Sequence, residues 1–266
     1  MEIVVAEDPQ DCAARVADIV TATISQGGRA LGLATGSSPL AVYTELIRRH
    51  REEGLSFAGA TAALLDEYVG LPPDHPRSYR RIIREVFTQH VDIDDADVLS
   101  PDGSTGDAFA AAASYEQVLK ERGPVDVQLL GIGTNGHLGF NEPTSSLRSR
   151  TRVKTLTSQT RRDNARFFDR PDDVPLHVIT QGLGTISDAR RLVLIATGEH
   201  KAAAVAAAVE GPLSARCPAS VLQLHPAATV VVDGAAASRL ELIDYYREVA
   251  LHRTSVPGAD RDANRA

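Results

Sequence analysis

Hydrophobic residues fall into short continuous runs that alternate with longer segments of helical spacing. The runs EIVVA (2–6) and ATVVVD (228–233) are apolar almost throughout, as strands buried on both faces of a sheet are. Residues 9–27 repeat their hydrophobic positions at intervals of three and four and end at a pair of glycines, which is typical of an amphipathic helix. The pattern predicts an α/β fold in which helices cover both faces of a parallel sheet.

The alternation continues to the C-terminal region without an internal repeat, a low-complexity linker or a break in composition. We predict a single α/β domain over residues 1–253 and a disordered tail at 254–266. Further strands are predicted at 29–35, 61–67 and 124–133, and two more within 174–211. Further helices are predicted at 40–50, 78–90, 106–122 and 236–251, and two more within 174–211.

Composition narrows the classes of function. The 266 residues are enough for one domain with a sizeable core. The net charge of −7 and the aromatic content of 5% argue against nucleic-acid binding, which needs a basic face and stacking platforms. No nucleic-acid partner is therefore expected.

Two features predict a cytoplasmic protein. Cys12 and Cys217 form no CxxC pair, which suggests a reducing compartment. The first residues lack a basic segment followed by an apolar one, and no apolar run approaches the roughly 18 residues of a membrane span. We expect no signal peptide and no membrane association.

A glycine-rich loop follows the predicted strand at 124–133. Gly131, Gly133 and Gly136 have the spacing of a dinucleotide-binding motif. That motif also needs a helix beginning at its last glycine and an acidic residue about 20 positions later. Gly139 and Pro143 would break such a helix, so we predict no nucleotide cofactor.

The same loop carries groups suited to proton transfer. Asn135, His137 and Glu142 lie within eight residues, just past the carboxyl end of a predicted strand, where open α/β sheets bind ligands. A histidine with a nearby carboxylate can act as an acid/base pair. The alternative is that both side chains only satisfy backbone amides of the turn.

A second turn is suited to binding an anion. Thr35, Gly36, Ser37 and Ser38 connect a predicted strand to a helix whose first residue we expect to be Pro39. Free backbone N–H groups, hydroxyls and the positive end of the helix together favour a phosphate. The alternative is an ordinary turn in which a hydroxyl caps the helix.

Local positive charge supports the anion site. Residues 148–170 hold eight basic side chains, Arg166 among them, against two acidic ones. Lys201 follows another predicted strand, at the same expected edge of the sheet. A charge run is usually a solvated face, but in an acidic chain it fits a small anionic ligand better than a polymer.

A carboxylate ends another predicted strand. The side chains of Asp66 and Glu67 should point in opposite directions, so one of them can face the ligand-binding edge. A partly buried carboxylate there has the raised pKa needed to remove a carbon-bound proton. The alternative is a helix or turn cap.

Other catalytic patterns are missing from the sequence. No histidine pair has HExxH spacing, so we expect no metal site. There is no GxSxG nucleophile motif, and neither cysteine has an activating partner in the sequence.

Seven stretches resemble the isomerising glucosamine-6-phosphate deaminase family in that family's order, from about residue 30 to residue 226. They are LGLATGSSPL, LDEYVGLPPDHPRSY, GIGTNGHLGFNEP, SSLRSRTRVKTLT, NARFFD, ITQGLGTI and VLQLHP. The resemblance implies a three-layer α/β/α Rossmann-like fold with a mainly parallel sheet of about seven strands. It also implies conversion of glucosamine 6-phosphate into fructose 6-phosphate and ammonia, with no cofactor and no metal.

The resemblance assigns a role to each matching residue. Asp66 is the base that moves a proton between C2 and C1. His137 opens the sugar ring, and Glu142 and Asn135 orient it; some members of the family have aspartate in place of Asn135. The implied phosphate ligands are Thr35, Gly36, Ser37, Ser38, Arg166 and Lys201.

Some members of the family are hexamers activated by N-acetylglucosamine 6-phosphate. The positions that match their activator site are Ser145, Arg152, Lys154 and Thr155, and their presence permits activation. The resemblance also implies a homo-oligomer, with a hexamer favoured. The segment at 241–253 departs from the activated members, because it does not align where a tyrosine completes their pocket.

Two other functions would share parts of this pattern. A 6-phosphogluconolactonase-like hydrolase would share the phosphate turn but not the LDEYVGLP segment. A non-catalytic sugar-phosphate sensor would normally carry a DNA-binding helix-turn-helix, for which the sequence offers no spare segment.

Overall fold

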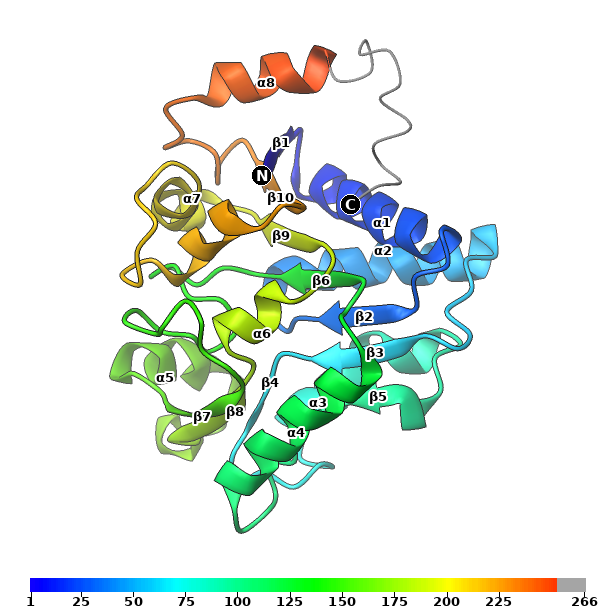
Figure 1. Ribbon diagram of the computed structural model, residues 1–266, viewed down its shortest axis with the longest axis vertical. Helices are drawn as coiled ribbons and strands as arrows, with labels where there is room; N and C mark the ends of the chain where they lie inside the picture. The colour runs from blue at the N-terminus through cyan, green and yellow to red at the C-terminus, as the bar shows by residue number, and fades with distance from the viewer. Residues whose placement is uncertain (253–266) are drawn as a thin grey trace.

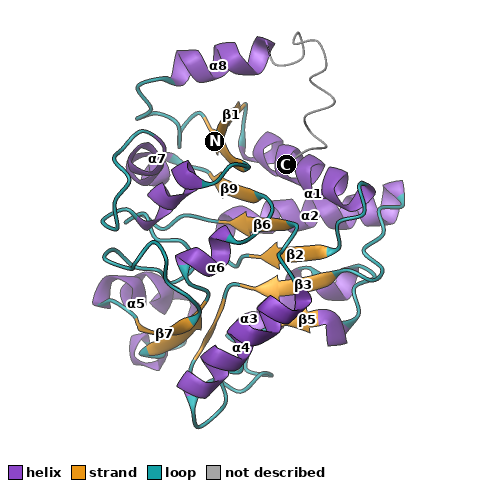
Figure 2. Cartoon of the chain, viewed as in Figure 1, coloured by secondary structure: helices purple, strands orange, loops and turns teal. Residues whose placement is uncertain are grey.

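The computed structural model of the chain describes residues 1–252. The predicted tail at 254–266 lies outside the described residues. Figures 1 and 2 show a central sheet with helices in front of it and behind it.

Seven strands form a parallel sheet in the order β1-β10-β9-β6-β2-β3-β5, and every neighbouring pair is parallel. Their bounds are β1 Glu2–Ala6, β2 Ala30–Leu33, β3 Thr61–Leu64, β5 Val98–Leu99, β6 Val127–Leu130, β9 Leu192–Ala196 and β10 Ala228–Asp233. The expected number of strands and their parallel arrangement are therefore confirmed.

Helices bury both faces of this sheet. Leu129 of β6 belongs to a hydrophobic cluster formed with α1, α2 and α3, whereas Leu130 belongs to a cluster formed with α6 and α7. Successive side chains of a strand point to opposite faces, so both faces need cover. The helix bounds are α1 Pro9–Ser25, α2 Ser37–Glu53, α3 Tyr79–Val86, α4 Ala108–Arg122, α5 Ser158–Asn164, α6 Leu183–Ser187, α7 Ala202–Val209 and α8 Ile243–His252. This confirms the predicted three-layer α/β/α arrangement.

A second, antiparallel sheet was not predicted. It has the order β4-β8-β7, with bounds β4 Asp66–Tyr68, β7 Arg152–Thr155 and β8 His177–Thr180. The expectation that the first strand of 174–211 joins the parallel sheet is wrong, because that strand is β8. The seventh parallel strand is instead the two-residue β5, whose hydrophobic run is too short to stand out.

The predicted strand at 61–67 is two strands. β3 ends at Leu64 in the parallel sheet, and β4 begins at Asp66 and pairs with β8, so that Asp66 lies opposite Thr180. The apolar run continues across the break, and periodicity alone could not locate it. Asp66 is therefore the first residue of a strand in the second sheet and does not end a parallel strand.

The start of α2 also differs from the expectation. The helix begins at Ser37 with Gly36 as its N-cap residue, so Pro39 is its third residue and not its first. Proline is tolerated anywhere in the first turn, because the N–H groups there have no partner within the helix.

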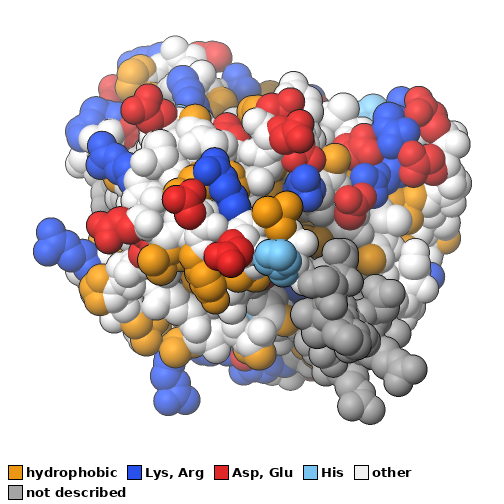
Figure 3. All heavy atoms as spheres, turned by 90° about the horizontal axis from the view of Figure 1, so that it is seen from above, with side chains coloured by type: hydrophobic (Ala, Val, Ile, Leu, Met, Phe, Trp, Pro, Cys, Tyr) orange, Lys and Arg blue, Asp and Glu red, His pale blue; other side chains and the backbone are white. Residues whose placement is uncertain are grey.

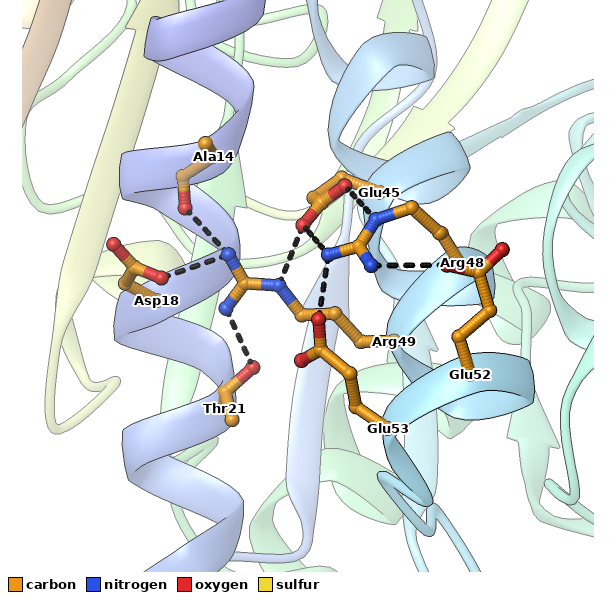
Figure 4. Close-up of polar contacts among 8 residues, drawn as sticks. All are labelled: Ala14, Asp18, Thr21, Glu45, Arg48, Arg49, Glu52 and Glu53. Carbon is orange, nitrogen blue, oxygen red and sulfur yellow. Dashed lines mark hydrogen bonds and ion pairs between the residues drawn. The ribbon is translucent and has the colours of Figure 1, made fainter.

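Helices α1 and α2 are tied together by one arginine (Figure 4). On α2, Arg49 forms an ion pair with Asp18 at 2.7 Å and donates to Thr21 Oγ1 at 3.2 Å, both on α1. It also donates to the backbone oxygen of Ala14 at 3.3 Å and pairs with Glu45 at 2.7 Å on its own helix. The Arg49 side chain is only 11% exposed, so its loss would leave these acceptors without their partner.

The last two features of the fold concern helix composition and the surface. Among residues 1–252, no helix combines the length and the apolar composition that crossing a bilayer requires. On the face seen from above, acidic and basic side chains are interspersed with hydrophobic ones (Figure 3).

The clamp between α1 and α2 can be tested with a pair of variants. We expect Arg49→Ala to lower the free energy of unfolding by about 0.5–1.5 kcal/mol, because the partly buried acceptors Ala14 O and Thr21 Oγ1 lose their donor. Arg48→Ala is the control, since its three ion-pair partners lie on its own helix and the side chain is 41% exposed. Urea unfolding should show a clearly larger loss for Arg49→Ala; equal losses would contradict a role in joining the helices.

Candidate active site

Three loops meet at one edge of the parallel sheet. β9, β6 and β2 are neighbours, so the segments that follow them (197–201, 131–142 and 34–38) lie next to one another. The arrowheads of β2 and β6 point to the left in Figure 1 and mark this edge. It is the carboxyl edge at which open α/β sheets bind ligands.

In the middle loop, Gly133 leaves room for the ring of His137. The His137 ring packs directly over Gly133, where a Cβ atom would lie 2.3 Å from ring Cε1. The backbone N–H of Gly133 also donates to the His137 carbonyl at 3.0 Å. No helix follows Gly136, so the structure lacks the helix that a dinucleotide motif requires.

Glu142 organises the polar side of this loop. It is 4% exposed and accepts hydrogen bonds from Asn135 Nδ2 at 2.7 Å and from Thr160 Oγ1. His137 Nδ1 lies 3.8 Å from Glu142 Oε2, so their attraction is electrostatic and not a direct hydrogen bond. Burial favours the protonated acid, but His137, Thr160 and Asn135 outweigh it and lower the pKa of Glu142 to about 2. Glu142 is therefore a fixed negative charge beside His137.

Thr160 is a contact that sequence reasoning missed. It lies on α5, within the basic segment that was interpreted as a source of positive charge, and it is buried. A single threonine among arginines carries no sequence signal. Only the packing of α5 against the loop reveals it.

The carboxylate of Asp66 is buried without a hydrogen-bonding partner. The residue is 5% exposed, and no donor within residues 1–252 reaches its side chain. It therefore caps neither a helix nor a turn, and that alternative is wrong. Burial, and then the charge of Glu67, raise the pKa of Asp66 well above its usual range.

Gly139 brings the loop of His137 against Asp66. A Cβ atom on Gly139 would lie 3.2 Å from Asp66 Oδ2 and 3.1 Å from Thr180 Oγ1, and the residue has a φ of +54°. Glycine alone adopts such a conformation readily and leaves this space free. Asp66 thus borders the loop that carries His137, because Gly139 is only two residues from His137 along the chain.

The N-terminus of α2 is open. Gly36 has a φ of 117°, and no side chain caps the first turn. The alternative of an ordinary hydroxyl-capped turn is therefore wrong. Thr35 is half-buried, and Ser37 and Ser38 lie at the start of the helix, where free N–H groups and the helix dipole favour an anion.

Two cations approach the same edge. Lys201 Nζ donates to the backbone oxygen of Ile132 at 2.7 Å, which ties the 197–201 turn to the loop. Burial, and then the charge of Arg166, lower the pKa of Lys201, which shows that the two cations are close enough to repel. No carboxylate within residues 1–252 forms an ion pair with Lys201, so an anion bound there would stabilise both.

A cavity of about 280 Å³ adjoins the same loop. It is bounded by the loop at Thr134, Asn135 and Gly136, by the alanine-rich face of α7 and by Cys217. Neither Asp66 nor His137 lines it, so this cavity is not where the predicted acid/base groups meet.

The predicted activator residues lie on β7 and before it. Ser145 is 3% exposed, and its hydroxyl has no partner in the described part of the chain. Arg152 donates to Asn141 Oδ1 at 2.9 Å, and Thr155 Oγ1 lies 3.2 Å from His177 Nδ1. Lys154 is the half-exposed third residue of β7. Through Asn141, Arg152 therefore contacts the segment that carries Glu142.

Within residues 1–252, no three histidine, cysteine, aspartate or glutamate side chains gather in a way that could hold a metal ion. Cys12 and Cys217 are both free thiols.

Comparison with protein families gives one match over most of the chain. Residues 6–231 match the family described as glucosamine-6-phosphate isomerases/6-phosphogluconolactonase. The match spans the three loops, both cations and Asp66.

Two similar proteins carry the same name. The chain is 62% identical over 255 residues to a protein from Rhodococcus opacus (strain B4) named glucosamine-6-phosphate deaminase, which covers 96% of this chain and 98% of that protein. It is 56% identical over 250 residues to a protein of the same name from Mycolicibacterium smegmatis, with 93% and 96% covered.

Solved structures show the same architecture. A structure described as a monomeric glucosamine-6-phosphate deaminase matches with a TM-score of 0.88 and 42% identity, over 90% of this chain and all of that one. A 6-phosphogluconolactonase from Trypanosoma cruzi matches with a TM-score of 0.72 and 19% identity, over 90% and 97%. The second likeness shows the fold alone.

The opposite environments of Asp66 and Glu142 predict opposite effects on stability. The raised pKa of Asp66 means that its favourable contribution is complete below its unfolded pKa of about 4 and is lost as the pH rises through the folded value. We expect Asp66→Asn to increase the free energy of unfolding at pH 8 by about 1–3 kcal/mol, and to increase it much less at pH 4.

Glu142→Gln is the control with the opposite sign. Because the pKa of Glu142 is lowered to about 2, its contribution is complete above its unfolded pKa and is lost as the pH falls toward 2. Urea unfolding at several pH values measures both variants. A destabilising Asp66→Asn at pH 8 would contradict the raised pKa of Asp66.

Proposed function

Because the chain belongs to the glucosamine-6-phosphate isomerase/6-phosphogluconolactonase family, we propose that it is a glucosamine-6-phosphate deaminase. The reaction converts glucosamine 6-phosphate and water into fructose 6-phosphate and ammonia, as a step of amino-sugar catabolism. The observation that carries the proposal is the buried Asp66 carboxylate beside the His137 loop, in a chain 62% identical to a protein of that name.

Ring opening is the first step. His137 removes the proton of the C1 hydroxyl and returns one to the ring oxygen, so that C1 becomes an aldehyde. Glu142 provides the negative charge that favours a protonated imidazole during this transfer, and Asn135 holds Glu142 through its amide. The ring of His137 is fixed by its packing on Gly133.

Proton transfer between carbons is the second step. The aldehyde at C1 acidifies the C2 proton, and Asp66 removes it. The C1 oxygen takes up the proton that the ammonium group at C2 gives up, which forms an enolamine. Return of the proton at C1 leaves an imine at C2, and water then replaces the nitrogen as ammonia leaves. A carboxylate without hydrogen-bond donors is a stronger base than a solvated one, which suits a carbon acid. None of these steps requires a metal or a nicotinamide.

The phosphate would be bound across two neighbouring loops. Backbone N–H groups and hydroxyls at the start of α2 would take its oxygens, and Arg166 and Lys201 would neutralise its charge. The residues proposed to form this site are Thr35, Gly36, Ser37, Ser38, Arg166 and Lys201.

We also propose how the enzyme is regulated and how it assembles. Ser145, Arg152, Lys154 and Thr155 form the proposed site for N-acetylglucosamine 6-phosphate as activator. The proposal includes a homo-oligomer, with a hexamer favoured, although one relative with 42% identity is described as monomeric. Light scattering tests the assembly, and a monomer in solution would remove that part of the proposal.

The reaction can be assayed directly with purified protein. We expect glucosamine 6-phosphate to yield equal amounts of ammonia and fructose 6-phosphate, and Asp66→Asn to lose at least about 100-fold in kcat while still binding the substrate, given the usual size of acid/base contributions. Parallel reactions contain 6-phosphogluconolactone as the alternative substrate, or added N-acetylglucosamine 6-phosphate. Hydrolysis of the lactone without release of ammonia would favour the hydrolase and reject the deaminase.

Lys201 is expected to act on binding more than on chemistry. Lys201→Ala should raise KM at least about 10-fold with a much smaller change in kcat, because a phosphate anchor contributes equally to the ground and transition states. Arg216→Ala is a control, since this exposed cation lines the 280 Å³ cavity, which contains neither Asp66 nor His137. A fall in kcat alone for Lys201→Ala would contradict the assignment.

A further inference from the structure

Glu67 is a second buried carboxylate next to Asp66, and the proposed chemistry does not use it. It is 4% exposed and accepts four hydrogen bonds. The donors are Tyr68 N at 2.9 Å, Ser78 Oγ at 2.8 Å, Tyr79 N at 3.0 Å and Arg80 N at 3.1 Å. Every partner is a donor, and an ionised carboxylate is the form that only accepts.

Three of those donors belong to the beginning of α3. Ser78 is its N-cap residue, and Tyr79 and Arg80 are its first two helical residues. A carboxylate at a helix N-terminus also interacts favourably with the helix dipole. Glu67 is therefore anchored as an anion and fixes the middle of β4 to α3.

The pairing of β4 places Asp66 and Glu67 on opposite sides of one strand. Asp66 lies opposite Thr180 of β8 and borders Gly139, whereas Glu67 turns toward α3 and lines a cavity of about 220 Å³ with Ser78 and Arg80. Asp66 has no donor in the described part of the chain, and Glu67 has four. Adjacent carboxylates thus have opposite environments.

We propose that Glu67 is a positioning residue for Asp66: its bonds to α3 hold β4 in place, and they fix a negative charge directly beside the neighbouring carboxylate. The inference rests on the proposed function, because it deepens the role of Asp66. Glu67 touches no reacting atom and acts only through Asp66.

The groups that face Asp66 support this assignment. Besides Glu67, the titratable groups whose charge couples to Asp66 are tyrosines: Tyr68 on β4, Tyr79 on α3 and Tyr115 on α4. Burial raises the pKa of each tyrosine, so all three are neutral at physiological pH. Thr180 and Gly139, which border Asp66 from β8 and from the loop, do not titrate. Glu67, whose four donors suit an ionised carboxylate, is therefore the charged neighbour of Asp66 among these groups.

The test compares three variants. Glu67→Gln removes the charge and keeps the size of the side chain, Glu67→Asp keeps the charge, and Asp102→Asn removes an exposed carboxylate that lines the same cavity as Glu67. We measure the dependence of kcat/KM on pH for glucosamine 6-phosphate, together with the titration of the Asp66 carboxyl carbon by NMR. Asp66→Asn assigns that resonance.

In Glu67→Gln we expect the acid limb of the pH profile and the Asp66 titration both to move to lower pH. The plateau of kcat should fall as well, because a weaker base removes the carbon-bound proton more slowly. Glu67→Asp and Asp102→Asn should leave both midpoints in place. A purely structural Glu67 would lower activity or stability without moving the Asp66 titration, and that result would overturn the inference.

A Glu67→Gln variant that does not fold and a wild-type protein without deaminase activity would give different results. If Glu67→Gln does not fold, the wild-type NMR titration decides, since interacting carboxylates titrate in coupled steps; a single unperturbed step at Asp66 would overturn the inference. If wild-type protein releases no ammonia, the proposed function fails, while the NMR comparison still measures the coupling between the two carboxylates.

Discussion

The buried Asp66 carboxylate, which has no donor in residues 1–252, is the constraint on which the rest of the site depends. Burial without a donor disfavours the charged form of this carboxyl and raises its pKa, so the surrounding structure must hold the side chain there. The break after β3 and the pairing of β4 with β8 fix its position. Gly139 then lets the His137 loop approach it, because any larger side chain would crowd the carboxylate.

The pKa values of two carboxylates of the site are shifted in opposite directions. Asp66 has a raised pKa, whereas the pKa of Glu142 is lowered to about 2 by the groups around it. Such a divergence separates a group that keeps its proton to higher pH than usual from one that remains a fixed charge. The position of Glu142 beside His137 and of Asp66 beside Gly139 divides the proposed chemistry between the ring oxygen and carbon.

The parallel sheet positions the proposed phosphate-binding residues. Because β9, β6 and β2 are neighbours, the turn with Lys201, the loop with His137 and the open end of α2 lie along one edge. Lys201 is bonded to the middle loop and forms no ion pair with a carboxylate in the described part of the chain, although the charge of Asp163 partly offsets that of Arg166. An anionic ligand at this edge would relieve the repulsion between Lys201 and Arg166 and satisfy the free N–H groups of α2.

The sequence by itself determined most of the helices, most strands of the parallel sheet and the loop residues, because hydrophobic period and turn chemistry are local properties. It did not predict α5, whose seven residues are mostly polar. It also identified Asp66, His137 and Lys201 as candidates, since each follows an apolar run. Only the tertiary structure decided that β4 and β8 form a second sheet, that Thr160 contacts Glu142 and that Gly139 borders Asp66. Those contacts join residues tens of positions apart, and pairing partners and burial depend on the packed chain, not on local pattern.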